Sequence, residues 1–120
     1  MLKDKINDVR DACFKESSKA GWWNSVRVFD DPFAVPAKLC LIHSEISEAM
    51  EGHRKGIMDD KLPHRPMIEV ELADALIRIA DLAGALGLDL GGAVDDKMAY
   101  NKKRSDHKIE NRTAKGGKAY

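Results

Sequence analysis

The stretch of residues 39–52, LCLIHSEISEAMEG, decides the fold class of this 120-residue chain. Its apolar residues recur every three or four positions, which is the spacing of one face of an α-helix. Pro36, a residue well suited to a first helical turn, stands shortly before it. We therefore predict a helix over about residues 36–52, on which Glu45 and Glu48 are neighbours because they lie three residues apart.

The helical spacing recurs in three further segments, and no alternating run is long enough for a useful strand. Helices are predicted over about residues 3–20, 66–86 and 90–107. Gly21 and Gly87 follow two of these segments as helix-ending glycines. Residues 52–66 contain two glycines and two prolines and are predicted to form a connection. The predicted fold class is all-α, a compact four-helix bundle formed by residues 1–107 as one domain and followed by a basic, flexible tail over 108–120.

Composition narrows the class of protein. Lysine plus arginine and aspartate plus glutamate both total 20, so no net charge favours a nucleic acid or a membrane surface as partner. The charges are unevenly placed, since residues 102–118 hold seven basic and two acidic side chains. The charged residues 1–10 do not resemble a secretory signal, and Cys13 and Cys40 form no C-x-x-C pair. We therefore predict a cytoplasmic protein that binds neither nucleic acid nor membranes.

A second pair of acidic residues, Glu71 and Asp74, repeats the three-residue spacing in the segment EVELADAL. The helix predicted around this pair is apolar over most of its circumference, so its acidic stripe needs a cation. Two carboxylates 4 Å apart repel each other by roughly 4 kcal/mol at an effective dielectric constant of 20. Oxygen ligands alone, without cysteine or an E-x-x-H pair, favour Mg²⁺ or Mn²⁺ over zinc or iron. The alternative is that both acidic pairs face solvent on ordinary helices.

The two pairs together resemble the signature of a known family, the MazG-like all-α nucleoside triphosphate pyrophosphohydrolases, which are related to the dimeric dUTPases. That signature is E-E-x-x-E followed by E-x-x-D, and here residues 44–48 read SEISE and residues 71–74 read ELAD. Ser44 replaces the leading glutamate, which leaves the four usual metal-binding positions intact. The resemblance covers about residues 35–107 and includes a closing segment, DKMAYNKKR, at residues 96–104.

The resemblance implies an enzyme that cuts a (d)NTP between its α and β phosphorus atoms, giving the monophosphate and pyrophosphate. Glu45, Glu48, Glu71 and Asp74 would hold one or more Mg²⁺ (or Mn²⁺) ions, with Glu48 as the general base that orients the attacking water. Similarly small members of the group, phage-encoded ones among them, suggest a purine deoxynucleotide such as dGTP or dATP. Two alternatives stay open: a dUTPase-like hydrolase, and a non-enzymatic helical interaction protein.

The closing segment carries the residues expected to meet the triphosphate. Lys97, Asn101 and Arg104 recur at intervals of four and three residues and so share one face of the last helix. Two cations and an amide on one face are suited to phosphate oxygens. Basic residues are also favoured at helix C-termini for electrostatic reasons, which is the structural alternative.

An aromatic segment after the first helix is the candidate base pocket. Trp22 and Trp23 are adjacent, so both rings cannot point the same way, and we predict that one packs while the other lines the pocket. Asn24 follows them and could read a base edge through its amide. A short chain with a nearly all-apolar third helix is also expected to cover exposed apolar surface by forming a homodimer or homotetramer.

Overall fold

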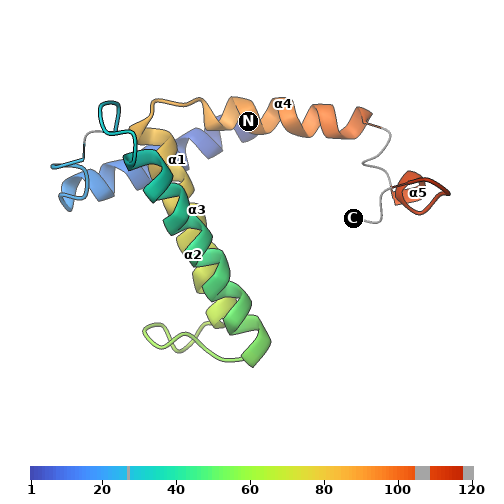
Figure 1. Cartoon of the computed structure of the whole chain (residues 1–120), viewed down its shortest axis with the longest axis horizontal. Coiled ribbons are helices and arrows are strands. Elements are labelled where there is room, and N and C mark those ends of the chain that lie inside the picture. Colours follow the sequence, from blue (N-terminus) through green and yellow to red (C-terminus); the bar gives the residue numbers. More distant parts are fainter. Residues whose placement is uncertain (27, 105–108, 118–120) are drawn as a thin grey trace. The chain divides into compact units, whose positions relative to one another are not determined.

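Every regular element that the structure describes, apart from one isolated bridge, is a helix (Figure 1). The structure is a computed structural model and describes residues 1–26, 28–104 and 109–117. Over these ranges the helices are α1 (Leu2–Lys19), α2 (Ala34–Lys55), α3 (Met67–Ala85), α4 (Leu90–Lys103) and α5 (Ile109–Arg112). The predicted all-α class is confirmed, and α1 to α4 correspond to the four predicted helices.

The ends of the helices differ from the predicted ends in two places. α2 continues through Gly52 to Lys55, and Gly56, at φ 61° in the left-handed region, ends it with its N–H directed to the last carbonyl groups of the helix. The predicted end at Gly52 was therefore wrong. α4 ends at Lys103, and residues 105–107 of the predicted fourth helix lie outside the described residues. The short helix α5, which was not predicted, lies within the segment expected to be a flexible tail.

The chain divides into two units, one formed by Asp8–Leu88 and the other by Met1–Asn7 with Asp89–Tyr120. The first unit contains α2, α3 and most of α1, and the second contains α4, α5 and the start of α1. A single domain over residues 1–107 stays a prediction.

The centre of the first unit is the antiparallel pair of α2 and α3, which lie side by side along their lengths (Figure 1). Small residues allow the close approach, since Ala49 and Ala75 are buried between the helices. At Gly52 a Cβ atom would lie only 2.7 Å from the Cβ of Met67. Gly52 therefore belongs to the helix contact, which explains why it does not end α2.

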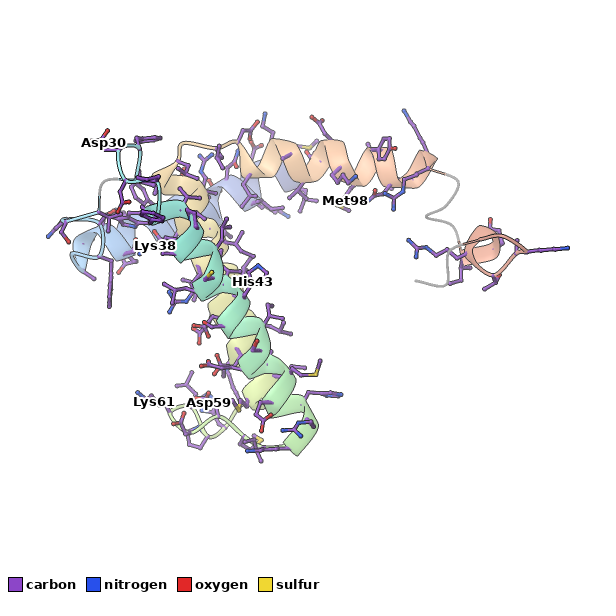
Figure 2. All side chains as sticks on the ribbon, viewed as in Figure 1. Asp30, Lys38, His43, Asp59, Lys61 and Met98 are labelled. Atoms are coloured by element: carbon purple, nitrogen blue, oxygen red, sulfur yellow. The ribbon has the colours of Figure 1, made fainter. Side chains whose placement is uncertain are left out.

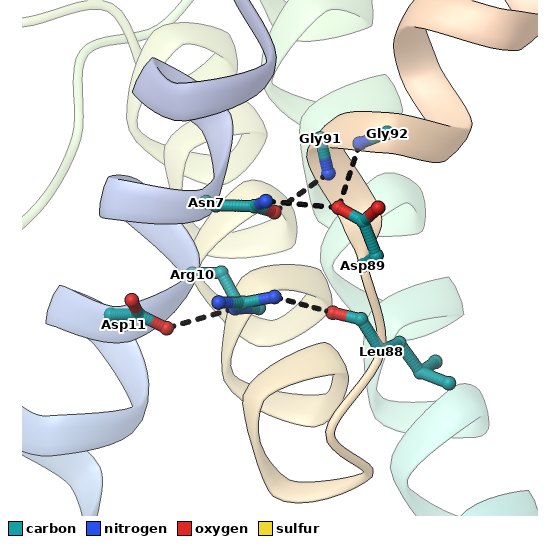
Figure 3. Close-up of polar contacts among 7 residues, drawn as sticks. All are labelled: Asn7, Arg10, Asp11, Leu88, Asp89, Gly91 and Gly92. Carbon is teal, nitrogen blue, oxygen red and sulfur yellow. Dashed lines mark hydrogen bonds and ion pairs between the residues drawn. The ribbon is translucent and has the colours of Figure 1, made fainter.

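α1 packs on the C-terminal end of α3 in the same unit. A Cβ atom at Gly84 would lie 2.5 Å from the Cβ of Phe14, so the glycine makes room for the phenyl ring, beside the buried Ala80. Arg10 adds a polar contact by donating from Nη1 to the carbonyl oxygen of Leu88 at 2.6 Å (Figure 3). The C-terminal end of α3 is thereby held against α1.

The connection between α2 and α3 is ordered by a buried carboxylate. Asp59 is 7% exposed, and its Oδ2 accepts the backbone N–H groups of Lys61 at 3.0 Å and Leu62 at 2.8 Å (Figure 2). An isolated antiparallel bridge between Met58 and Pro66 closes the same loop. Oδ2 of Asp59 and the N–H groups of Lys61 and Leu62 therefore satisfy one another within the connection, which is typical of a structural aspartate in a turn.

In the second unit, two polar side chains fix the start of α4 (Figure 3). Asp89 accepts the N–H of Gly92 at 2.9 Å as the N-cap residue and also accepts a hydrogen bond from Nδ2 of Asn7 at 2.9 Å. Asn7 in turn accepts the N–H of Gly91 at 2.8 Å. A Cβ atom at Gly91 would lie 2.1 Å from the carbonyl oxygen of Lys3, so α4 begins in direct contact with the backbone of α1.

No helix in the described part of the chain is both long and apolar enough to cross a membrane.

Candidate metal centre

Three carboxylates from α2 and α3 meet between the two helices. Glu45, Glu71 and Asp74 each offer one oxygen atom, and these three atoms lie within 4.8 Å of one another. Glu45 and Glu71 are each 8% exposed, and Asp74 is half-buried. The three-residue spacing places Glu71 and Asp74 on one face of α3, opposite Glu45 on α2. The structure therefore brings together three of the four predicted metal ligands.

Glu48, the fourth predicted ligand, lies at the edge of this cluster. Its side chain is exposed and does not belong to the group of three close oxygen atoms. Its negative charge still contributes to raising the pKa of Glu71. Glu48 lies one turn after Glu45, where the cluster meets solvent. This position suits contact with a water molecule better than it suits the role of a buried metal ligand.

Glu71 has the most strongly shifted pKa of the cluster. Burial, followed by hydrogen bonds with Glu45 and Glu48 and by the charges of Glu48 and Asp74, raises the pKa of Glu71 to about 8. Its Oε2 atom is buried, and no hydrogen-bond partner reaches it among the described residues. A buried carboxylate oxygen without a donor is costly, so either a proton or a cation has to sit beside it near neutral pH.

Glu45 has the opposite tendency. Burial acts to raise its pKa, but hydrogen bonds with Glu71 and Arg78 and the positive charge of Arg78 outweigh burial and lower it. Nε of Arg78 donates to Oε1 of Glu45 at 2.9 Å. Glu45 is therefore ionised while Glu71 keeps a proton, which is how neighbouring acids share one proton in a tight cluster. A divalent cation bound there would replace that proton.

A pocket of about 510 Å³ opens beside the cluster, all of it within the unit Asp8–Leu88. This volume falls in the range of small-molecule sites. Its lining includes Trp22, Lys38, Glu45, Asp74, Arg78 and Asp81. Two of the candidate ligands therefore face the same space as two cations and an indole ring.

The two tryptophans play different parts. Nε1 of Trp23 lies 2.9 Å from Oδ1 of Asp81 and 3.0 Å from Oγ of Ser17, so its N–H is engaged inside the unit. Trp22 is 69% exposed and lines the pocket. Asn24 is exposed and is not part of this lining. The arrangement agrees with one packed and one pocket-lining tryptophan, and contact with a base stays a prediction for Trp22 and Asn24.

The predicted triphosphate residues Lys97, Asn101 and Arg104 belong to the other unit, where two of them lie near the ring of Tyr100. Nζ of Lys97 lies 4.7 Å from the centroid of Tyr100, and the guanidinium carbon of Arg104 lies 5.9 Å from it. Oδ1 of Asn101 is buried, with no hydrogen-bond partner in the described part of the chain. Lys97 and Asn101 lie four residues apart on α4, whereas Arg104 follows the end of the helix in extended backbone, and phosphate contact by these residues stays a prediction.

Two cations near the carboxylates were missed as candidate site residues. Lys38 precedes Glu45 by seven residues, and Arg78 follows Asp74 by four, so each lies on the same helix face as a ligand. This periodicity was available in the sequence. It could not show that both side chains line one pocket, because that depends on how α2 and α3 are paired.

Comparison with known proteins found no matching family model, no matching curated sequence and no matching solved structure. The MazG-like resemblance therefore rests on the short segments 44–48, 71–74 and 96–104. A function for this chain has to be inferred from the chemistry of the carboxylates and of the pocket beside them.

Proposed function

We propose that this chain is a metal-dependent nucleoside triphosphate pyrophosphohydrolase, which converts a (d)NTP to the (d)NMP and pyrophosphate. The observation that carries the proposal is the buried Oε2 of Glu71, to which the described residues supply no donor. Glu71 belongs to the cluster with Glu45 and Asp74, beside a pocket. Oxygen-only ligands of this kind suit Mg²⁺ or Mn²⁺. The MazG-like resemblance of the same residues supports the choice of reaction.

The side chains divide the work between binding and proton transfer. Glu45, Glu71 and Asp74 would hold the cation, which neutralises phosphate charge and lowers the barrier to attack by water. Glu48, exposed at the edge of the cluster, would accept a proton from that water and orient it as the general base. Arg78 keeps Glu45 ionised through the 2.9 Å contact, so this ligand is ready without losing a proton.

The substrate part of the proposal rests on the resemblance and on the pocket. A purine deoxynucleotide, dGTP or dATP, is the first choice, with the exposed ring of Trp22 available to stack on the base. Lys97, Asn101 and Arg104 are proposed as further triphosphate contacts. We place the enzyme in the cytoplasm, in agreement with its two free cysteines.

A homodimer or homotetramer is part of the proposal. Along α2 and α3 a row of large apolar side chains, between 39% and 64% exposed, is left uncovered in a single copy. This row comprises Leu39, Ile46, Met50, Leu72, Leu76 and Ile79. Light scattering at micromolar protein should give a multiple of 13.3 kDa, and a mass equal to 13.3 kDa would contradict the assembly.

The proposal is tested by measuring pyrophosphate release from a panel of NTPs and dNTPs, with Mg²⁺ or Mn²⁺. We expect metal-dependent release that is fastest with a purine dNTP. Fastest release from dUTP would indicate the dUTPase-like alternative. No release from any nucleotide with either metal would exclude the hydrolase and favour a helical interaction protein, for which the apolar row on α2 and α3 would be the contact surface.

A further inference from the structure

Two cations line the pocket from opposite helices. Lys38 belongs to the N-terminal part of α2 (Figure 2) and Arg78 to α3, and both line the space that Glu45 and Asp74 also line. A pocket bordered by several carboxylates repels an anion unless positive charge is fixed within it. The position of these two side chains is therefore the feature that decides whether an anionic ligand fits.

Arg78 is held in place at one end only. Its Nε donates to Oε1 of Glu45 at 2.9 Å, while its terminal Nη atoms have no hydrogen-bond partner among the described residues. The Glu45 side chain is 10% exposed and that of Arg78 is 41% exposed, so the guanidinium reaches from a buried acid into the open pocket. A guanidinium anchored through Nε keeps a pair of N–H donors suited to two oxygens of one phosphate.

Lys38 is positioned by a cation–π contact instead of an ion pair. Its Nζ lies 4.7 Å from the ring centroid of Trp23, which is a favourable cation–π distance. That ring is itself fixed by hydrogen bonds to Asp81 and Ser17 and by an edge-on contact with Phe14 at 6.1 Å. Lys38 is therefore positioned by an aromatic ring, no carboxylate within the described residues forms an ion pair with it, and its hydrogen-bond donors stay available to a ligand.

We propose that Lys38 and Arg78 form a phosphate-binding pair that contacts the polyphosphate of the ligand held at the carboxylate cluster. The identification of that ligand as a nucleotide rests on the proposed function, whereas the recognition of polyphosphate rests on the pocket alone. The pair lies entirely within the unit Asp8–Leu88. Two pre-positioned cations reduce the ordering cost of binding, and because they come from different helices they can contact different phosphate groups of one polyphosphate.

The test measures the binding of inorganic tripolyphosphate in the presence of Ca²⁺ by calorimetry, for wild type, Lys38→Gln and Arg78→Gln. Each variant should bind about tenfold more weakly or worse, since each loses a charged hydrogen-bond donor to phosphate. Arg54→Gln is the matched control, because Arg54 pairs with Glu51 at 2.6 Å near the other end of α2. The control should bind as wild type does. Arg78→Lys should retain part of the affinity, because the charge remains while the fork of donors is lost.

Two further measurements separate the outcomes. Mn²⁺ binding without phosphate, followed by electron paramagnetic resonance, should not be weakened in Lys38→Gln, and melting curves should show Lys38→Gln and Arg78→Gln folded. Equal tripolyphosphate affinity in wild type and both variants, or no binding by wild type, would overturn the phosphate-binding pair. Wild-type pyrophosphate release with unchanged KM in both variants would likewise overturn the pair and leave the hydrolase standing. Tripolyphosphate binding that depends on the pair, without release from any nucleotide, would support the pair and overturn the hydrolase.

Discussion

The hairpin made by α2, the connection 56–66 and α3 buries carboxylates at two places, and they are satisfied in different ways. Asp59 in the connection is 7% exposed and accepts two backbone N–H groups, while Glu71 in α3 is 8% exposed and has an oxygen that no donor reaches among the described residues. Burial is the same, so burial alone does not mark a functional acid. The supply of hydrogen-bond donors distinguishes the two places, because a buried acid without donors needs a proton or a cation.

The largest expected effect is on turnover, at the carboxylate cluster. Glu48→Gln and Asp74→Asn keep the size of each side chain and remove a charge, and each should lower pyrophosphate release by about 100-fold or more. The metal-free variants should be as stable as wild type or slightly more stable, because like-charge repulsion is relieved. Steady-state kinetics and melting curves check both parts.

The matched control for this prediction is Asp59→Asn, which changes a carboxylate buried to a similar degree outside the cluster. It should retain wild-type turnover. If Asp59→Asn lost as much activity as Asp74→Asn with its fold intact, the contrast between the two places would be wrong.

The pH dependence of metal-free stability should reveal the shared proton. Folded Glu71 keeps its proton up to a pKa of about 8, whereas the ordinary carboxyl value is 4.5. The folded state therefore binds more protons between these two values, and stability should fall as pH rises through this window. The lowered pKa of Glu45 acts only below the window, where stability is lost as pH falls. Melting curves in a chelator, from roughly pH 5 to pH 9, measure the slope.

The control for the slope is Glu71→Gln, which carries no titrating proton at this position and should flatten the curve. Saturating Mg²⁺ should reverse the trend, since metal binding strengthens as the proton becomes easier to displace. A slope that is identical in wild type and Glu71→Gln would show that another group is responsible.

At the connection the expected effect is on stability alone. Asp59→Ala leaves the N–H groups of Lys61 and Leu62 without their acceptor and should cost about 1–3 kcal/mol of unfolding free energy. Asp59→Asn keeps an acceptor oxygen and should cost less. Chemical denaturation measures both, and calorimetry with Mn²⁺ should show unchanged metal affinity in the folded variants. A large loss of metal affinity in Asp59→Ala would mean that the two places are coupled.

The smallest expected effect concerns the two tryptophans, which also differ in whether their polar group has a partner among the described residues. Trp23 has its N–H engaged and Trp22 is exposed in the pocket lining, so Trp22→Ala should weaken nucleotide binding by a few-fold, about 1 kcal/mol, from lost stacking. Tripolyphosphate binding should not change in this variant. Titration of a nucleotide with Ca²⁺ in place of Mg²⁺, followed by tryptophan fluorescence, checks the contact, and equal nucleotide affinity in Trp22→Ala would assign the ring a structural part.

The sequence predicted the features that depend on local spacing. The helical periods identified α1 to α4, and the three-residue intervals placed Glu71 and Asp74 on one face of α3. Features that depend on how helices pair were not predicted. Gly52 was interpreted as a helix end because glycine weakens helices locally, whereas the structure uses it to admit Met67 from α3.

The same limit applies to the candidate site. Residue spacing could not indicate that Asp59 is buried, because Asp59 lies in a loop that has no periodic sequence pattern. Its carboxylate accepts hydrogen bonds from backbone N–H groups of the same loop. Nor could the spacing decide which tryptophan packs, because the partner of Trp23 is Asp81, far along the chain on α3. Site residues that share a helix were therefore predictable, and those joined only by the packing of two helices were not.

Gly52 has a consequence for the choice of ion. It lies seven residues after Glu45 on the same face of α2, and its missing side chain lets α3 approach. The closeness of the helices sets how far apart the oxygens of Glu45 and Glu71 lie, and Mg²⁺ needs shorter bonds than Ca²⁺, about 2.1 Å against about 2.4 Å. A methyl group at this position would wedge the helices apart and widen the gap toward the larger ion. Discrimination by ionic radius would then be determined at a residue two turns along α2 from Glu45.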